Sequence, residues 1–329
     1  MVAQRLPRIL PRPHDYNASS LETMRCTAIV VTYNSGAAIA ACLEALAHED
    51  CEIIVVDNAS ADPTVRRVEE FAAWHPVRLI ANEQNRGFGA AVNQAARDAG
   101  GDALLILNPD SIAEPGAVAA LLRCMESTAA AAVGGALLET DSQPARGFAF
   151  RRLPTLWALI FEVTLANRMW PGNPINRRYR SLDADYSRQQ EVEQPAGACL
   201  AVRRAAWDKV GGFDEQFLPV WFEDVDLCKR LRDQGSRIFY CPEARFRHGG
   251  AHSVGQLSFR EKQIFWYENM LRYARKHFSG GQVFLLRLAI VKGMLLRSIG
   301  AVFGARTAPL GESLSAYLAV AAHTLGRRE

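Results

Sequence analysis

Short apolar runs alternate with amphipathic stretches over the first third of the chain. Four of the runs do not alternate with polar residues, which is typical of strands covered on both faces of a sheet; they are residues 28–32, 53–56, 77–80 and 103–107. The stretches between them have helical periodicity and lie at residues 37–47, 64–74 and 90–99. This order predicts a Rossmann-like open sheet with helices on its faces.

The second half of the chain has a less regular pattern. Residues 150–193 show no clear period, and we interpret them as a substrate-facing insertion over the sheet. Regular structure resumes at residue 194, where the pattern predicts a strand at 197–202 and helices at 204–210 and 221–232.

An apolar segment at residues 283–303 is long enough to span a bilayer, but it contains Arg287, Lys292 and Arg297. Five-residue steps turn about 140° each on a helix, so these charges spread around it and count against a clean span. Two interpretations stay open for this segment. It is either a helix packed in the core or a helix on a membrane surface.

The composition narrows the class of protein. Of the 329 residues, 49% are hydrophobic and 22% charged, which excludes disordered, collagen-like and multi-span membrane proteins. The seven cysteines lie at least nine positions apart, so we exclude C-x-x-C motifs and interpret them as free thiols in the cytoplasm. Residues 1–13 lack the apolar run of a signal peptide, and residues 1–25 are predicted to be a loose leader.

The net charge of +3 is distributed unevenly. Residues 270–329 contain nine lysines and arginines but only two acidic residues. This surplus favours attraction to anionic lipid and a peripheral position on the inner face of the cell membrane. We expect no nucleic-acid partner.

Polar side chains follow three of the predicted strands. Thr32, Tyr33 and Asn34 end the first strand, Asp57 follows the second and Asp110 follows the fourth. Ligands of such open sheets bind beyond the carboxyl ends of the strands, so we expect a binding crevice there.

Some of these polar residues have an alternative interpretation as helix caps. Asn58 and Ser60 are as consistent with N-caps as with a binding site. Asp110 is a weaker candidate cap, because Glu114 and Pro115 make a better helix start.

Further groups that can do chemistry occur downstream, at Glu223, Asp224, Asp226 and His248. An acid after a parallel strand and a distant imidazole can hold a divalent cation against a diphosphate, and a second carboxylate can accept a proton. Asp226 is expected to be structural. Dinucleotide and P-loop sites are excluded, because the glycines at 87 and 89 lack a third and no G-x-x-x-x-G-K-[ST] motif occurs.

Seven motifs occur in one order along the chain. They are VVTYN (30–34), VVDNAS (55–60), NRGFGAAVNQA (85–95), LNPD (107–110), GACLAVRR (197–204), GGFDEQF (211–217) and FEDVDLCKRL (222–231). In this order the chain resembles the family 2 glycosyltransferases of the GT-A fold. HGGAHSVG (248–255) and NPINRRYR (173–180) most resemble rhamnosyltransferases that act on polyprenyl-diphosphate-linked sugars.

The resemblance implies an α/β fold of the GT-A type, with a Rossmann-like mixed central sheet and helices on both faces. The GT-A domain would cover residues 26–278, with a nucleotide-sugar half at 26–135 and an acceptor half at 136–278. Residues 279–329 would be a basic, apolar helical segment.

The resemblance also assigns tasks to residues. Asp224 would be the catalytic base with Glu223 beside it, and Asp110 and His248 would hold Mg²⁺ or Mn²⁺. Asn108 stands where the family often has a first aspartate, so the metal site has one carboxylate fewer. The donor would contact Thr32, Tyr33, Asn34, Asp57, Asn85, Arg86, Gly87, Phe88, Asn108 and Asp110. The acceptor would contact Gly197, Ala198, Trp221 and Glu223.

The implied reaction is an inverting transfer of L-rhamnose from dTDP-rhamnose to a polyprenyl-diphosphate-linked saccharide, in the synthesis of a cell-envelope polysaccharide. Two alternatives stay open. One keeps the mechanism but uses UDP-linked galactose, glucose or GlcNAc, and the other is a non-catalytic nucleotide-sugar-binding partner. The oligomeric state is also open, with a homodimer as one alternative.

Overall fold

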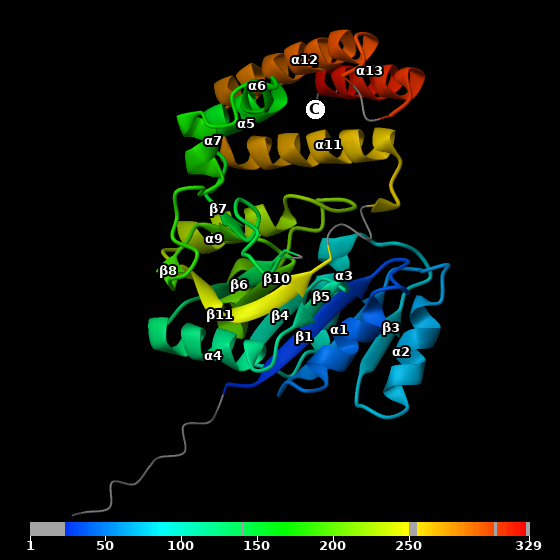
Figure 1. The fold of residues 1–329 in the computed structure, drawn as a ribbon, viewed down its shortest axis with the longest axis vertical. Helices are drawn as coiled ribbons and strands as arrows, with labels where there is room; N and C mark the ends of the chain where they lie inside the picture. The colour runs from blue at the N-terminus through cyan, green and yellow to red at the C-terminus, as the bar shows by residue number, and fades with distance from the viewer. Residues whose placement is uncertain (1–23, 140, 250–254, 306–307, 327–329) are drawn as a thin grey trace, which may run out of the picture.

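A mixed sheet forms the centre of the protein (Figure 1). The computed structural model describes residues 24–139, 141–249, 255–305 and 308–326. Within these ranges the strand order is β3-β2-β1-β4-β10-β6-β11-β5, and β8 pairs with β11 at one side.

The first half of the sheet is parallel and matches the predicted alternation of strands and helices. Its strands are β1 (Cys26–Thr32), β2 (Glu52–Asp57), β3 (Arg78–Ala81) and β4 (Ala103–Leu107). The helices that connect them are α1 (Ile39–Leu46), α2 (Thr64–Ala72) and α3 (Phe88–Asp98).

The second half makes the sheet mixed, as expected. β10 (Cys199–Arg203) lies antiparallel between β4 and β6 (Ala132–Leu138). β11 (Ile238–His248) runs parallel to β6 and antiparallel to β5 (Ser111–Ala113) and β8 (Gln190–Glu191). The helices of this half are α4 (Ala117–Thr128), α8 (Arg204–Val210) and α9 (Glu223–Asp233).

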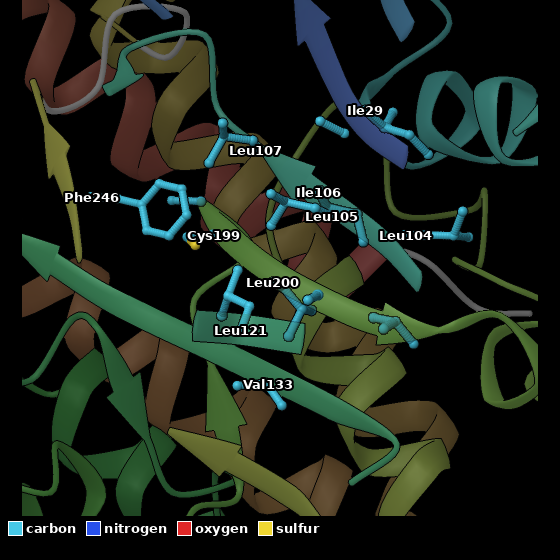
Figure 2. Close-up of a cluster of buried hydrophobic side chains, with 14 of the residues drawn as sticks. Ile29, Leu104, Leu105, Ile106, Leu107, Leu121, Val133, Cys199, Leu200 and Phe246 are labelled. Carbon is cyan, nitrogen blue, oxygen red and sulfur yellow. The ribbon is translucent and has the colours of Figure 1, made fainter. Parts of the chain in front are cut away.

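The core lies on both faces of the central strands. Every residue of β4 is fully buried, although successive side chains of a strand point to opposite faces. Figure 2 shows Leu104 to Leu107 of this strand with Leu200 of β10 and Phe246 of β11 in the same cluster. This packing explains why the strands have continuous apolar runs in the sequence.

The interpretation of residues 150–193 as irregular was wrong. The segment contains β7 (Phe150–Arg151) and the helices α5 (Leu156–Val163), α6 (Ala166–Met169) and α7 (Pro174–Tyr179). Thr155 and Asn173 start two of these helices by accepting hydrogen bonds from the backbone N–H groups three residues later. The helices are short, so none of them repeats often enough to show a period in the sequence.

Three long helices cover one end of the molecule, with α5 to α7 beside them (Figure 1). They are α11 (Phe259–His277), α12 (Gly280–Val302) and α13 (Leu310–Gly326). No helix within the described part of the chain is long and apolar enough to cross a membrane.

The predicted helix at residues 283–303 is α12, and one side of it packs in a core. Leu286, Ile290 and Met294 of α12 share an apolar cluster with Val163 of α5 and Phe222. Arg297 turns inward and donates hydrogen bonds to carbonyl oxygens at the end of α5. The cluster crosses the predicted domain boundary at residue 278, and that boundary stays a prediction.

Candidate functional site

A cavity of about 520 Å³ lies beyond the carboxyl ends of β1 and β4. Asp110, Asp224 and His248 all line it, although they are far apart in the chain. The structure therefore brings together the three groups that the sequence singled out for metal binding and proton transfer, and the volume is that of a small-molecule site. The remaining lining residues include Val31, Phe88, Asn108, Phe148, Gly197, Ala198, Trp221 and Glu223.

Strand pairing brings His248 to Asp110. The end of β11 runs antiparallel to β5, with His248 opposite Ser111, and the Gly249 N–H donates to the Asp110 carbonyl at 3.0 Å. As a result, His248 Nε2 lies 3.5 Å from Asp110 Oδ1 and 3.4 Å from Asn108 Nδ2.

The carboxylate of Asp110 has an unsatisfied oxygen. Asp110 Oδ2 is buried and has no hydrogen-bond partner among the residues that the structure describes. Buried polar atoms without a partner are rare in folded proteins, and one that lines a cavity can bind a ligand or an ion. A carboxylate oxygen beside an imidazole nitrogen fits Mg²⁺ or Mn²⁺.

The protein alone does not complete such a metal site. Within the described ranges, no group of three or more His, Cys, Asp or Glu residues is placed to hold a metal ion. A cation held by Asp110 and His248 would take its other ligands from a diphosphate and water, the usual arrangement for Mg²⁺.

Asp224 is held rigidly in the first turn of α9. Its Oδ2 accepts hydrogen bonds from the Gly197 N–H at 2.9 Å and from Gln194 Nε2 at 3.1 Å, and its Oδ1 accepts one from the Val225 N–H at 2.8 Å. Burial raises the pKa of Asp224, and the backbone N–H groups of Gly197 and Val225 together with the charge of Arg151 oppose the rise. The result is a positioned carboxylate that binds a proton more readily than an ordinary aspartate.

The backbone that enters α9 is strained. Trp221 and Phe222 have φ angles of 81° and 74°, a left-handed conformation that bulky residues rarely adopt. Strain of this kind is concentrated at functional sites, where the surrounding structure holds it in place. Here it turns the chain so that Trp221, Glu223 and Asp224 all line the cavity.

Glu223 lines the cavity as an almost fully buried carboxyl. Its Oε2 has no hydrogen-bond partner in the described part of the chain. Burial, and secondly the charge of Asp224, raise the pKa of Glu223 well above its ordinary value. Glu223 is therefore suited to donate a hydrogen bond to a ligand, whereas Asp224 is suited to accept one.

Asp57 lies below the surface. It is 1% exposed, and its oxygens accept hydrogen bonds from Thr32 Oγ1 at 2.8 Å, the Ser60 N–H at 2.8 Å and Ser60 Oγ at 2.5 Å. The alternative interpretation of Ser60 and Asn58 as helix caps is wrong, because α2 begins at Thr64. A direct contact between Asp57 and a nucleotide stays a prediction.

Gln256 is a neighbour of the predicted donor pocket that the sequence did not reveal. Its Nε2 donates to the Asn34 carbonyl at 2.8 Å and its Oε1 accepts from Asn34 Nδ2 at 2.8 Å. Only its place after the HGGAHSVG motif could have suggested it, and residues 250–254 of that motif lie outside the described residues.

Some of the other predicted donor residues line the cavity and some do not. Phe88, Asn108 and Asp110 line the cavity. Asn85 and Arg86 are exposed outside its lining, and Asn85 Oδ1 accepts a hydrogen bond from the Gly87 N–H at 2.9 Å. Their contacts with a donor stay predictions.

The predicted acceptor residues Gly197, Ala198, Trp221 and Glu223 all line the cavity. Sequence analysis missed Phe148, which is 40% exposed and whose ring centroid lies 5.5 Å from that of His248. An aromatic residue in an insertion gives no signal of its own, because the same residue type is common in cores.

Asp226 has the structural role expected of it. It is fully buried and pairs with Arg230 of α9 and with Lys276 and His277 of α11. The last two pairs connect α9 to α11. Burial alone would raise its pKa, but hydrogen bonds from His277, Lys276 and Arg230 and the charge of Arg230 lower the pKa to about 2.

We expect Asp226→Asn to lower the free energy of unfolding by about 3–5 kcal/mol at pH 7, because it leaves buried cations without their counter-charge. The pKa of Asp226 is lowered from 3.8 to about 2, so its contribution is present above pH 4 and is lost as the pH falls towards 2. Urea unfolding measures both effects. Asp233→Asn on the exposed side of α9 is the control and should change the free energy by less than about 1 kcal/mol. An equal loss in the two variants would contradict the structural role.

Comparison with known proteins gives matches to both sequence and fold. The model of Glycosyl transferase family 2 matches residues 27–209, and that of the N-terminal domain of galactosyltransferase matches residues 177–251. The chain is 32% identical over 242 residues to N-acetylglucosaminyl-diphospho-decaprenol L-rhamnosyltransferase of Mycobacterium tuberculosis, over 69% of this chain and 77% of that protein.

Two further relatives extend the comparison. The chain is 28% identical over 197 residues to Rhamnosyltransferase WbbL of Escherichia coli, over 59% of this chain and 70% of that protein. The solved structure of the mannosyltransferase PcManGT from Pyrobaculum calidifontis, in complex with GDP-Man and Mn²⁺, superposes with a TM-score of 0.54 at 18% identity. The superposition covers 92% of this chain and 87% of that chain, and it concerns the fold alone.

Proposed function

This chain belongs to glycosyl transferase family 2 and is a glycosyltransferase, and we propose that it moves L-rhamnose from dTDP-rhamnose to a lipid-linked saccharide. Its fold is GT-A. Two sequence relatives are named as rhamnosyltransferases, and the name of one specifies N-acetylglucosaminyl-diphospho-decaprenol. The observation that carries the proposal is that Asp110, Asp224 and His248 line one cavity.

Asp224 is the proposed catalytic base. An acceptor hydroxyl is a poor nucleophile until a carboxylate within hydrogen-bond reach accepts its proton. Asp224 is fixed by three N–H donors and lines the cavity, which suits that task. Attack on the face of the sugar opposite the leaving group inverts the anomeric centre.

Asp110 and His248 are the proposed protein ligands of Mg²⁺ or Mn²⁺, with Asn108 beside them. A bound cation would offset the negative charge that develops on the leaving diphosphate. Glu223, whose pKa is raised by burial and by the charge of Asp224, would donate a hydrogen bond from its protonated form to a hydroxyl of the acceptor.

A screen of nucleotide sugars tests the proposal. Turnover would be measured with and without Mn²⁺, using a short prenyl-diphosphate-linked GlcNAc as acceptor. We expect dTDP-rhamnose to be the preferred donor. A preference for UDP-linked galactose, glucose or GlcNAc would contradict the rhamnosyl assignment, and the absence of both transfer and donor hydrolysis would favour a non-catalytic binding partner.

The end of the molecule that carries α12 is the proposed membrane contact. The exposed apolar side chains of α12 recur at three- and four-residue steps and form one stripe along the helix. They are Phe284, Leu285, Leu288, Leu295, Leu296, Ile299 and Val302. Lys292 is exposed within the stripe. The exposed Trp170 follows α6, which packs on α5, and α5 packs on α12. An apolar stripe with a basic residue suits an anionic lipid surface.

We expect the protein to sediment with vesicles that contain phosphatidylglycerol, and Trp170→Ala to weaken this binding about tenfold, because a buried aromatic side chain contributes about 1.5–3 kcal/mol. Trp74→Ala is the matched control, since Trp74 and Trp170 are both 62% exposed but Trp74 follows α2 in the other half of the protein. Equal losses in the two variants, or no binding by the unchanged protein, would contradict the membrane contact.

A further inference from the structure

A second cavity, of about 430 Å³, lies between the insertion and α9. We call it the arginine cleft, because five arginines line it: Arg151, Arg152, Arg177, Arg178 and Arg232. Arg151 lies at the end of β7 and Arg152 directly after it, Arg177 and Arg178 lie in α7, and Arg232 lies in α9. The cleft therefore forms only when the insertion folds back onto α9.

The cleft has more positive than negative charge. Its three carboxylates each pair with an arginine of the cleft, namely Asp183 with Arg177, Glu193 with Arg152 and Glu191 with Arg232, and Glu191 also pairs with Arg237 outside the cleft. Arg151 and Arg178 pair with none of these carboxylates, and Arg151 donates a hydrogen bond to the Gly147 carbonyl at 2.5 Å. Arg178 is exposed and has no ion pair within the described part of the chain, whereas Arg180 of the same basic run turns away to Glu162. The cleft therefore has a surplus of positive charge, and Arg178 is exposed to a ligand.

A two-stranded sheet connects the arginine cleft to the cavity lined by Asp110, Asp224 and His248, which we call the catalytic cavity. β7 pairs with β9 (Gln194–Pro195), and Arg151 stands directly opposite Gln194. Gln194 in turn donates its hydrogen bond to Asp224 Oδ2 at 3.1 Å. Gln194 is therefore paired with Arg151 of the cleft on the neighbouring strand and hydrogen-bonded to Asp224, the proposed catalytic base.

We propose that the arginine cleft binds the diphosphate group of the lipid-linked acceptor, an inference that rests on the proposed function. The diphosphate is attached to the acceptor sugar, so it lies about one sugar ring away from the hydroxyl that Asp224 deprotonates. Guanidinium groups bind phosphate oxygens through paired hydrogen bonds, which suits arginine better than lysine for this task.

The arrangement also separates the two diphosphates of the reaction. That of the donor belongs with Asp110 and His248 in the catalytic cavity, while that of the acceptor lies in the arginine cleft. α7, which carries Arg178, packs on α5, and α5 packs on α12 with its exposed apolar stripe. The helix that carries Arg178 is thus connected through α5 to the helix that carries the exposed apolar stripe.

Kinetics of Arg178→Ala test the proposal. We expect KM for prenyl-diphosphate-linked GlcNAc to rise at least about tenfold, because hydrogen bonds to charged groups are lost. The rate with octyl-GlcNAc, which has no diphosphate, should not change. Arg188→Ala is the matched control, since Arg188 is exposed in the same insertion but lies outside the cleft. An equal change with both acceptors, or an unchanged KM, would overturn the proposal.

Binding of inorganic diphosphate separates this proposal from the proposed function. Without metal or donor, the unchanged protein should bind inorganic diphosphate in a calorimetric titration, and Arg178→Ala should weaken binding about tenfold while Arg188→Ala does not. That result supports an anion site in the cleft even if no rhamnose is transferred. In the transfer assay, inorganic diphosphate should compete with the prenyl-diphosphate-linked acceptor. Equal binding by the two variants would overturn the arginine cleft, whatever the donor screen shows.

Discussion

Asp224→Asn is expected to reduce sugar transfer by about 10²–10⁴-fold while leaving donor binding nearly unchanged. The amide cannot accept the proton of the acceptor hydroxyl, but it has the shape of the carboxylate and can still accept hydrogen bonds from Gly197 and Gln194. The measurements are the turnover rate and the thermal shift caused by the nucleotide sugar. The two together separate loss of the base from loss of the site.

The control for this variant is Asp233→Asn, which removes a carboxylate from the exposed end of the same helix. It should retain the full turnover rate. The pH profile gives an independent check, because Asp224 must be deprotonated to act and its pKa is raised, chiefly by burial. Activity should therefore fall on the acid side at a higher pH than an ordinary aspartate would cause. Substantial turnover by Asp224→Asn would refute its role.

Asp110→Asn is expected to reduce transfer at least about 100-fold, because a cation at this site would stabilise the leaving diphosphate by several kcal/mol. Asp110 Oδ2 is buried without a hydrogen-bond partner among the described residues, so replacing that oxygen removes no hydrogen bond that the structure shows. Turnover would be measured against Mn²⁺ concentration, with chelation by EDTA as the metal-free reference. The variant should need more Mn²⁺ as well as turn over more slowly.

A gain-of-charge variant strengthens this test. Asn108 Nδ2 lies 3.4 Å from His248 Nε2, so Asn108→Asp places a second carboxylate beside the proposed metal ligands. This variant should reach half of its maximal rate at a lower Mn²⁺ concentration than the unchanged protein. If neither substitution altered the dependence on Mn²⁺, the metal assignment for Asp110 and His248 would be wrong.

Local sequence was sufficient for the parallel half of the fold. The predicted strands at 28–32, 53–56 and 103–107 correspond to β1, β2 and β4, because fully buried strands need continuous apolar runs. The polar residues after these strands could also be identified from the sequence. A strand that leaves the core ends in side chains that water or a ligand can solvate.

The strands β6 and β11 and the helices of the insertion were not predicted. β11 contains Pro242 and charged residues and shifts register between Cys241 and Arg245, so no regular period marks it. Its pairing with β5 nevertheless brings His248 to Asp110. Sequence motifs could suggest that His248 belongs to the site, but its distance from Asp110 depends on the pairing of His248 with Ser111, which lie 137 residues apart in the chain.

The chemical groups of the proposed catalytic cavity and their order along the chain were thus already contained in the sequence, as was the likeness to glycosyltransferases. Burial and partners came from the fold. Asp57 and Ser60 bond to each other beneath the surface, Glu223 is enclosed while Asp224 is hydrogen-bonded, and the arginine cleft exists only where the insertion meets α9. The sequence states which side chains are present and how far apart they lie in the chain. The pKa of a side chain and the number of its atoms left without a hydrogen bond depend on neighbours that long-range packing brings to it.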